Sequence, residues 1–479
     1  MMGQWQKQSE LWVEPVNIGR RIPEDHLLRK INQVLDLSFV REEVAGFYGR
    51  NGQVSVDPVI IMKLMLVLFL DDVRSERELL RVLPLRLDYL WFLGYGLEDE
   101  VPHHSVLSKA RKRWGVEVFR RLFGRTIEQC LAAGLIEGSK VHIDASLITA
   151  NASRNSVIEV AVERELAKLE EGAAEEEPLP PGGGPVNRRR RSTTDPDSTV
   201  VRHQHGKSTP SYKNHRVLDD KAGVITALKT TTGAIDEGGE LMSLLEQHAA
   251  NTERAAKVAV ADSRYGSSAN FIALARARIK AHVADLRSRM RNARAVGIYE
   301  PRKFHYHKPS DTYTCPAGQE LNRHHYHAAR GYYEYRTARG TCDACALRAY
   351  CTRDKTGRTL KRYAGQELLD RARRQSHSPA ARRDRQRRQW FQERNFGEAA
   401  VCHGFKRARW RGLGPQNIQY LLIAALQNLR ILARKAPQRA LRALLTLRAA
   451  LTRYFDVPPL PFSLFLKNGL RPGGWLHAI

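Results

Sequence analysis

The sequence has no long uncharged apolar run and little cysteine. The longest apolar stretch runs from Val59 to Leu70 and is interrupted by Lys63, so it is far shorter than the roughly 20 residues needed to span a bilayer. The start of the chain lacks a basic segment followed by an apolar one, which is the pattern of a secretory signal. Six cysteines in 479 residues are too few for a disulfide framework. We therefore expect a cytosolic protein that does not enter a membrane.

Acidic residues are scarce relative to basic ones. Lys and Arg number 78 against 51 Asp and Glu, which gives a net charge of +27. A surplus of this size attracts a polyanion and releases its counterions. The hydrophobic content of 42% and the charged content of 27% are ordinary for a folded chain and exclude global disorder. The composition favours nucleic-acid contact over a merely solvated basic surface, and the length predicts roughly two to four domains.

The N-terminal part of the chain is predicted to be helical. Apolar residues recur at helical spacing between about Pro23 and Gly134. Within this region a short turn precedes a basic helix, for which Ser105 is the expected N-cap. This arrangement is typical of helix-turn-helix proteins that read a DNA groove, although a solvated surface helix explains it as well. Both interpretations stay open from the sequence.

Short apolar β-rich segments follow, with helical segments between the later ones. The expected strands are 141–146, 215–220, 223–231, 257–262 and 280–286, and the expected helices are 239–250 and 268–279. This alternation predicts a mixed α/β layer in which at least part of the sheet is parallel. Residues 165–196 have an acidic half, a Pro/Gly hinge and an Arg run, so they are predicted to form a disordered loop.

The rest of the chain predicts an insertion and further helices. Residues 288–383 are irregular and rich in Tyr, His, Cys and Arg, whereas helical periodicity resumes after residue 383 and continues in two amphipathic helices near the C-terminus. The predicted fold is multidomain α+β. Its expected parts are a helical domain for DNA binding and dimerisation (1–135), the first part of an α/β core (136–287), an inserted subdomain (288–383), two further core helices (384–435) and a helical tail (436–479).

Two aspartates stand at the ends of predicted strands. Asp144 comes near the C-terminal end of one buried strand, and Asp262 leads from another into a turn that suits Gly266, before a helix that starts near Ser267 or Ser268. Each aspartate alone is more often a cap or turn residue than a ligand. However, ligands bind at the carboxyl ends of parallel strands. Paired carboxylates repel each other unless a cation neutralises them, and such hard oxygen donors favour Mg²⁺ or Mn²⁺.

A third acid, Glu393, lies in a predicted helix among Arg387, Arg388, Trp390 and Arg394. It is either an ion-pair partner of these cations or part of a metal site with the two aspartates. Phosphoryl transfer with two metal ions needs acids on both sides of the reacting phosphate, because one ion activates a water or sugar hydroxyl and the other stabilises the leaving oxygen. Three carboxylates from separate elements can supply such a site.

Four of the six cysteines are gathered in the predicted insertion. Cys315, Cys342, Cys345 and Cys351 have the spacing C-x26-C-x2-C-x5-C, which is enough for one tetrahedral Zn²⁺. The two-residue spacer is the most specific part, because it lets both thiolates reach one metal. We predict a structural zinc that takes no part in the chemistry, with free thiols as the alternative. The two remaining cysteines stand apart and are expected to be packing residues.

Taken together, these segments resemble the bacterial insertion-sequence transposases of the Asp-Asp-Glu type, which have a ribonuclease-H-like catalytic core. The resemblance spans nearly the whole chain. The segments that carry it are 22–40, 57–83, 101–115, 141–153, 195–219, 258–267, 393–413 and 417–432. No single motif is specific; the resemblance rests on their order and on spacings of 118 residues from Asp144 to Asp262 and 131 from Asp262 to Glu393.

The resemblance implies a DNA transposase that binds transposon ends, cleaves them with water and joins the freed 3′ hydroxyl to target DNA. It assigns Asp144 and Asp262 to the metal-bridging acids and Glu393 to the third ligand, with two Mg²⁺ or Mn²⁺ ions as cofactors. The implied partners are double-stranded DNA and further copies of the chain, as a homodimer or higher oligomer, with no membrane and no small-molecule substrate. The implied location is the bacterial cytosol, in association with the nucleoid. Two alternatives are a ribonuclease-H-like nuclease that only cleaves and a transposase-derived DNA-binding protein without catalysis.

Basic residues near these motifs are expected to contact DNA. They are Lys109, Arg111, Lys112, Arg113, Lys213, Arg387, Arg388, Lys406, Arg407 and Arg409. The chain departs from its relatives at one position, because they often carry a basic residue seven positions after the Glu, as a phosphate contact. Here that residue is Ala400, and Lys406 and Arg407 come further on.

Overall fold

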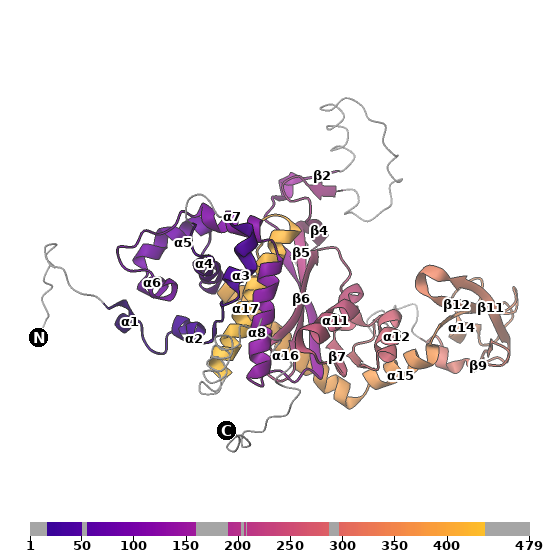
Figure 1. The fold of residues 1–479 in the computed structure, drawn as a ribbon. Coiled ribbons are helices and arrows are strands. Elements are labelled where there is room, and N and C mark those ends of the chain that lie inside the picture. Colours follow the sequence, from indigo (N-terminus) through magenta and orange to yellow (C-terminus); the bar gives the residue numbers. More distant parts are fainter. Residues whose placement is uncertain are drawn as a thin grey trace, which may run out of the picture.

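The computed structural model describes residues 17–49, 55–159, 190–202, 206, 208–286 and 297–435. The predicted helical tail after residue 435 lies outside the described residues, as do residues 165–189 of the predicted loop. The described part contains the expected N-terminal helices, a central mixed sheet, a small β subdomain and two long helices (Figure 1). No helix in these ranges is long and apolar enough to cross a membrane.

The N-terminal region is helical, as predicted. Its α-helices are α1 (Ile18–Arg21), α2 (Leu27–Val34), α3 (Val40–Val44), α4 (Pro58–Leu70), α5 (Glu76–Val82), α6 (Leu87–Leu93), α7 (Ser105–Trp114) and α8 (Glu117–Ala132). Helix α4 begins where the Asp57 side chain accepts a hydrogen bond from the Val59 amide and Pro58 occupies the first turn. It is apolar all round and largely buried from Ile61 to Leu70, so the other helices pack around it.

The basic helix α7 is present, but Ser105 is not its N-cap. The cap position belongs to His104, which makes no side-chain cap hydrogen bond, and Ser105 is the first residue of the helix. The Ser105 hydroxyl lies 2.9 Å from Nδ1 of His103. The expected cap is therefore wrong by one residue, because this hydroxyl is engaged by the preceding turn.

The central sheet has the order β4-β5-β1-β7-β8, with β6 also paired to β5. Its strands are β1 (Lys140–Thr149), β4 (Thr199–Arg202), β5 (Ser208–Asp219), β6 (Ile225–Thr232), β7 (Val258–Ala261) and β8 (Lys280–Val283). Strand β1 is antiparallel to β5 and parallel to β7, and β7 is parallel to β8. The prediction of a mixed α/β layer with a partly parallel sheet is confirmed.

Helices cover both faces of this sheet. One face packs against α8, α16 (Pro379–His403) and α17 (Leu413–Lys435), in a core that also takes in α2 to α7. The other face packs against α11 (Leu241–Thr252), α12 (Ser268–Arg276) and α15 (Gln366–Ser376). The N-terminal helices therefore share one hydrophobic core with the sheet (Figure 1).

Part of the predicted disordered loop is ordered. Residues Arg190–Ser192 form β3, which pairs with β2 (Val157–Glu159). The Ser192 and Asp195 side chains are fully buried, and Asp195 accepts a hydrogen bond of 2.6 Å from the Tyr212 hydroxyl. The prediction of disorder is wrong for residues 190–196, because these buried polar contacts hold the returning chain against the sheet.

The inserted subdomain is a separate five-stranded sheet with the order β13-β12-β11-β10-β9. Its elements are β9 (His305–His307), β10 (Thr312–Thr314), β11 (Glu320–His327), β12 (Tyr332–Arg336), α14 (Arg348–Cys351) and β13 (Thr359–Tyr363). It has its own small core and projects beyond α12 and α15 (Figure 1). Helix α15, within the predicted insertion, packs against α12 and β8 and contributes Leu369 to the core of the main sheet.

Candidate active site

Asp144 and Asp262 lie level on neighbouring parallel strands. In the β1–β7 ladder Lys140 pairs with Val258 and His142 with Val260, so the two aspartates stand two positions beyond the last pair on their respective strands. Burial raises the pKa of Asp144; the Asp262 carboxylate raises it further, whereas Arg388 and the Ala145 amide oppose the rise. The two acids predicted from the sequence therefore come together at one point of the sheet.

The turn after β7 fixes Asp262. Its Oδ1 accepts a hydrogen bond of 2.9 Å from the Arg264 amide, and Ser267 caps α12 through the Asn270 amide at 3.2 Å. A side chain at Gly266 would not fit, because a Cβ there would lie 2.0 Å from the carbonyl oxygen of Ala284. The predicted order of strand, acid, glycine turn and capped helix is present.

Arg388 of α16 contacts Asp144 directly. Its Nη1 donates a hydrogen bond of 2.6 Å to Asp144 Oδ2. The Asp144 side chain is 23% exposed and that of Arg388 13%. Arg388 was expected to contact DNA; instead it is engaged by the acid, because a half-buried carboxylate needs a cation beside it.

Glu393 does not reach the two aspartates. It is exposed on α16, and its Oε1 accepts a hydrogen bond of 3.0 Å from Gln389. Helix α16 nevertheless lies along β1, because Gln392 donates to the carbonyl oxygen of His142 over 2.9 Å. Glu393 follows Arg388 by five residues, or about 7.5 Å along a helix axis. The structure thus brings two of the three predicted acids together and leaves the third on the adjacent helix, without a recorded contact to either.

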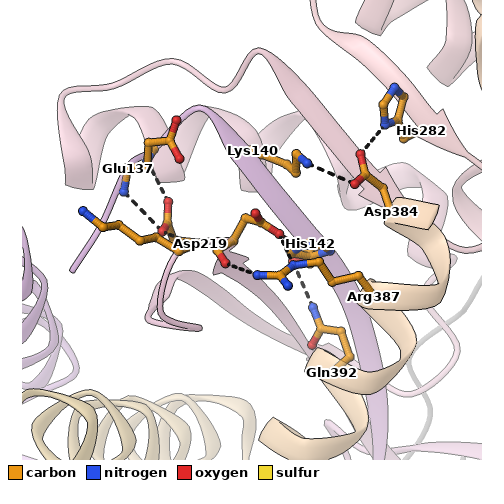
Figure 2. A network of polar contacts seen from close by, with 11 residues as sticks. Glu137, Lys140, His142, Asp219, His282, Asp384, Arg387 and Gln392 are labelled. Atoms are coloured by element: carbon orange, nitrogen blue, oxygen red, sulfur yellow. Dashed lines mark hydrogen bonds and ion pairs between the residues drawn. The ribbon is translucent and has the colours of Figure 1, made fainter. Parts of the chain in front are cut away.

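Two acid-centred contacts fasten α16 to the sheet (Figure 2). The Asp384 carboxylate accepts a hydrogen bond of 3.0 Å from Lys140 Nζ, and its other oxygen lies 2.6 Å from His282 Nδ1. Burial alone would raise the pKa of Asp384, but the hydrogen bonds from Lys140 and His282 outweigh it and lower that pKa. Asp220 binds His142 at 2.7 Å and Arg387 at 2.7 Å. Neither acid was predicted from the sequence. Arg387, expected to contact DNA, is half-exposed and pairs with Asp220.

A buried arginine lies across the sheet from Asp144. Arg216 pairs with Asp144 in the β1–β5 register and is fully buried. Its Nη1 donates hydrogen bonds of 2.7 Å to the side-chain oxygens of Asn395 and Gln427. These bonds connect α16 and α17 to β5. Burial lowers the pKa of Arg216 to about 9. Sequence reasoning missed this residue, because its partners lie far along the chain.

Several predicted DNA contacts point inward. Arg111 is buried and paired with Glu76. Lys213, also buried, donates 2.8 Å to the Ile235 carbonyl and lies 3.2 Å from Glu237. These side chains are already paired inside the fold, so their assignment to a DNA surface is corrected.

Arg409 is a further inward-facing cation. It donates 2.5 Å to Asp72 and also contacts the carbonyl oxygens of Leu68 and Val73, with 11% of its side chain exposed. Its DNA assignment is corrected for the same reason. The predicted contacts that remain exposed are Lys109, Lys112, Arg113, Arg387, Lys406 and Arg407.

Lys406 is an exposed cation held close to the acids. Its Nζ donates 2.6 Å to the Ser146 hydroxyl, two residues beyond Asp144 on the same strand. Burial lowers the pKa of Lys406, as does Arg216, whereas Asp144 raises it. The loop is fixed there because the Thr149 amide donates 3.0 Å to the carbonyl of Lys406. A basic group therefore stands beside the site even though residue 400 is Ala.

The donor chemistry of the aspartate pair fits a hard divalent cation. Both side chains offer carboxylate oxygens, the donors that Mg²⁺ and Mn²⁺ prefer, and Arg388 holds one of these oxygens. Across the described ranges, no three His, Cys, Asp or Glu side chains already stand together in an arrangement that could hold a metal ion.

The four cysteines of the insertion also come together. Cys315, Cys342, Cys345 and Cys351 line one cavity in the β subdomain. None of them forms a disulfide.

Two segments of the chain match transposase families. Residues 16–113 match the family model described as Transposase domain (DUF772), and residues 314–433 match the one described as Transposase DDE domain. The second match includes Glu393 but neither aspartate. These matches indicate a DNA transposase and bear out the resemblance to the Asp-Asp-Glu type.

Other comparisons add little. A search of curated proteins finds no match. A similar solved structure is a cryo-EM structure of a piggyBac transposase synaptic complex with hairpin DNA, with 10% identity, 94% of this chain and 84% of that chain covered, and a TM-score of 0.29. A TM-score this low does not establish a shared fold.

Proposed function

We propose that the chain binds transposon ends, cleaves the DNA there and joins the 3′ ends to target DNA by metal-dependent phosphoryl transfer. The observation that carries the proposal is the parallel register that sets Asp144, in the middle of β1, level with Asp262, directly after β7. Two carboxylates on rigid strands form a preorganised place for a divalent cation. The matches of residues 16–113 and 314–433 to transposase family models support this class of reaction.

Each residue near the pair has a role in this proposal. Asp144 and Asp262 hold the cations, and Glu393 joins them when α16 closes on DNA. When bound, two Mg²⁺ or Mn²⁺ ions activate the attacking hydroxyl and stabilise the leaving oxygen. Arg388 leaves Asp144 at that point and donates to a phosphate, for which its planar guanidinium is suited. Lys406 supplies a second phosphate contact.

The exposed face of α7 reads the DNA end in this proposal. Lys109, Lys112 and Arg113 are exposed there, whereas Leu107 and Trp114 face the core. Double-stranded DNA is the partner that fits this basic face and the net charge of +27. Because two transposon ends have to be held together, we propose that a homodimer or higher oligomer is the working form.

The test uses the purified full chain, Mg²⁺ and a duplex that carries the end sequence. We expect cleaved and joined products, and we expect Asp144→Asn, Asp262→Asn and Glu393→Gln to abolish both while DNA binding persists. Glu398→Gln is the matched control, because Glu398 lies on the same helix and pairs with Arg430 at 3.1 Å. Strand transfer at the wild-type rate by Glu393→Gln would remove Glu393 from the site.

The same experiment separates the alternatives. Cleavage without joining identifies a nuclease with this fold. A mobility shift without any cleavage identifies a DNA-binding protein that has lost its chemistry. The intact Asp144 and Asp262 pair favours an active enzyme over the latter.

A further inference from the structure

The inserted subdomain is small for a unit that holds its own sheet. Its sheet lies between residues 297 and 363, fewer than the roughly 70 to 80 residues below which one core rarely suffices. Its described core contains six buried residues, which are Phe304, Tyr313, Leu321, Tyr335, Cys351 and Leu360. Domains of this size are usually stabilised by disulfides or a metal, and its cysteines form no disulfide.

Three separate segments deliver the four cysteines to one cavity. Cys315 follows β10, Cys342 and Cys345 lie between β12 and α14, and Cys351 ends α14. The cavity that they line has a volume of about 20 Å³, which is space for one water-sized particle or ion. Convergence of four thiols from three segments on so small a space is not required by packing, because apolar residues fill a core without it.

The turn that bears Cys315 is shaped to support a thiolate. Gly318 has a φ of +78°, a conformation that favours glycine, and this turn directs the Gln319 amide at the Cys315 sulfur over 3.3 Å. The Thr337 hydroxyl lies 3.4 Å from the Cys342 sulfur. Hydrogen bonds of this kind orient and stabilise metal-ligating groups.

A cation beside the cavity has no anionic partner among the residues that the structure describes. Arg358 lines the cavity with the cysteines and donates only to carbonyl oxygens, those of Cys351 at 3.2 Å and Tyr299 at 3.0 Å. Its Nε is buried and has no acceptor in the described part of the chain. Four thiolates around one divalent ion carry a net charge of −2, and this guanidinium would neutralise part of that charge.

We propose that Cys315, Cys342, Cys345 and Cys351 bind one Zn²⁺ as a tetrahedral tetrathiolate that fastens β10, β12 and α14 together. Binding forms four Zn–S bonds and releases the four thiol protons, without any redox change. The sulfurs do not yet stand at ligating geometry in the described chain, so the ion draws them inward. The site is remote in sequence from the aspartate pair, so the proposal does not depend on the proposed function.

The first experiment measures the metal content of the purified full chain by mass spectrometry. We expect one zinc per chain, and less than a tenth of that after Cys342→Ser with Cys345→Ser. Cys402→Ser is the matched control, because Cys402 lies on α16 outside the subdomain, and it should retain the full zinc content. A wild-type chain without zinc after expression in zinc-containing medium, and without uptake of added Zn²⁺, would overturn the proposal.

A second measurement holds even where the serine variants fail to fold. The wild-type chain is titrated with a mercurial thiol reagent while a metallochromic dye follows the released zinc. We expect one zinc to be released as four thiols react, and the stripped chain to unfold at a lower temperature. Reaction of the native thiols without release of metal, or a disulfide among the four, would count against a zinc site.

Discussion

Arg388 donates a hydrogen bond of 2.6 Å from Nη1 to Oδ2 of Asp144. The arginine is therefore a built-in cation at the carboxylate that the proposed function assigns to a metal ion. A guanidinium and a divalent ion cannot both occupy the same oxygen at full strength, because like charges repel each other in a half-buried site. Metal binding and movement of Arg388 are accordingly coupled.

Removal of this arginine should strengthen metal binding. We expect Arg388→Met to bind Mn²⁺ about tenfold more tightly, which corresponds to about 1.4 kcal/mol, because the ion no longer displaces a guanidinium. Isothermal titration calorimetry measures the change. Arg394→Met is the control, because Arg394 is exposed on the same helix and lies over Trp390. Equal affinity for Mn²⁺ in the wild type and Arg388→Met would show that the ion does not compete with Arg388.

Loss of the Asp384 anchor should lower stability in a pH-dependent way. The pKa of Asp384 is lowered in the fold, so its stabilisation is present above the ordinary Asp pKa of about 3.9 and is lost as the pH falls through the folded value. We expect Asp384→Asn to cost about 1 to 2 kcal/mol at pH 7 and progressively less as the pH falls below the ordinary Asp pKa of about 3.9. Urea unfolding across this range tests the sign. A cost that stays constant with pH would exclude the ionic contact as its cause.

Two neighbouring cations of α7 should behave differently. Arg111 pairs with Glu76 and lies 3.8 Å from the centre of the Trp410 ring, so Arg111→Leu should destabilise the chain by about 3 kcal/mol through the uncompensated Glu76. Lys112 is exposed, so Lys112→Gln should leave stability unchanged and weaken DNA binding. The logarithm of the DNA-binding constant should fall less steeply with the logarithm of the salt concentration, by about the slope that one released counterion contributes. Unfolding curves and fluorescence anisotropy at several salt concentrations separate the two effects. Normal salt dependence in Lys112→Gln would place DNA elsewhere.

Lys406 should matter for DNA handling rather than for the fold. We expect Lys406→Gln to raise the KM for DNA by about tenfold, the effect of a lost charge-assisted phosphate contact of about 1.4 kcal/mol, because the amine is held beside Asp144 by Ser146. Lys221→Gln is the control, because Lys221 is exposed next to Asp220, at the opposite end of β1. Cleavage kinetics with end-sequence DNA make the comparison. An equal KM in both variants would show that Lys406 does not contact the substrate.

Local features of the fold were predictable from the sequence. Residues within a few positions of one another determine the β7 strand, the turn at Gly266 and the cap at Ser267. The residue types in this segment and their order therefore predict its structure. The level placement of Asp144 and Asp262 was also predictable in outline, because carboxyl ends of parallel strands share one edge. The four cysteines were grouped correctly, because a two-residue spacer limits how far apart two thiols can lie.

Long-range contacts were not predictable in the same way. Arg388 and Asp144 are 244 positions apart, and Arg216 and Asn395 are 179 apart. The choice between a cation that faces DNA and one that faces the interior depends on how helices lie on the sheet, which periodicity does not report. Arg111 and Arg409 were misjudged for this reason. Glu393 is the reverse case, because its assignment depends on the resemblance alone and its side chain has no described contact with the other acids.

The hydrophobic core that the N-terminal helices share with the central sheet sets a distance along the bound DNA. The basic helix α7 and strand β1, which bears Asp144, both contribute to one continuous set of buried residues, from Leu28 to Leu432, whereas β7, which leads to Asp262, packs in the core on the other face of the sheet. Because α7 and β1 pack in the same core, the distance between the proposed DNA-reading helix and Asp144 is constant. If the proposed function holds, the protein cleaves at a fixed distance from the DNA sequence that it binds. One extra base pair between that sequence and the cleavage site, which lengthens the duplex by about 3.4 Å, should therefore shift the position of cleavage along the element.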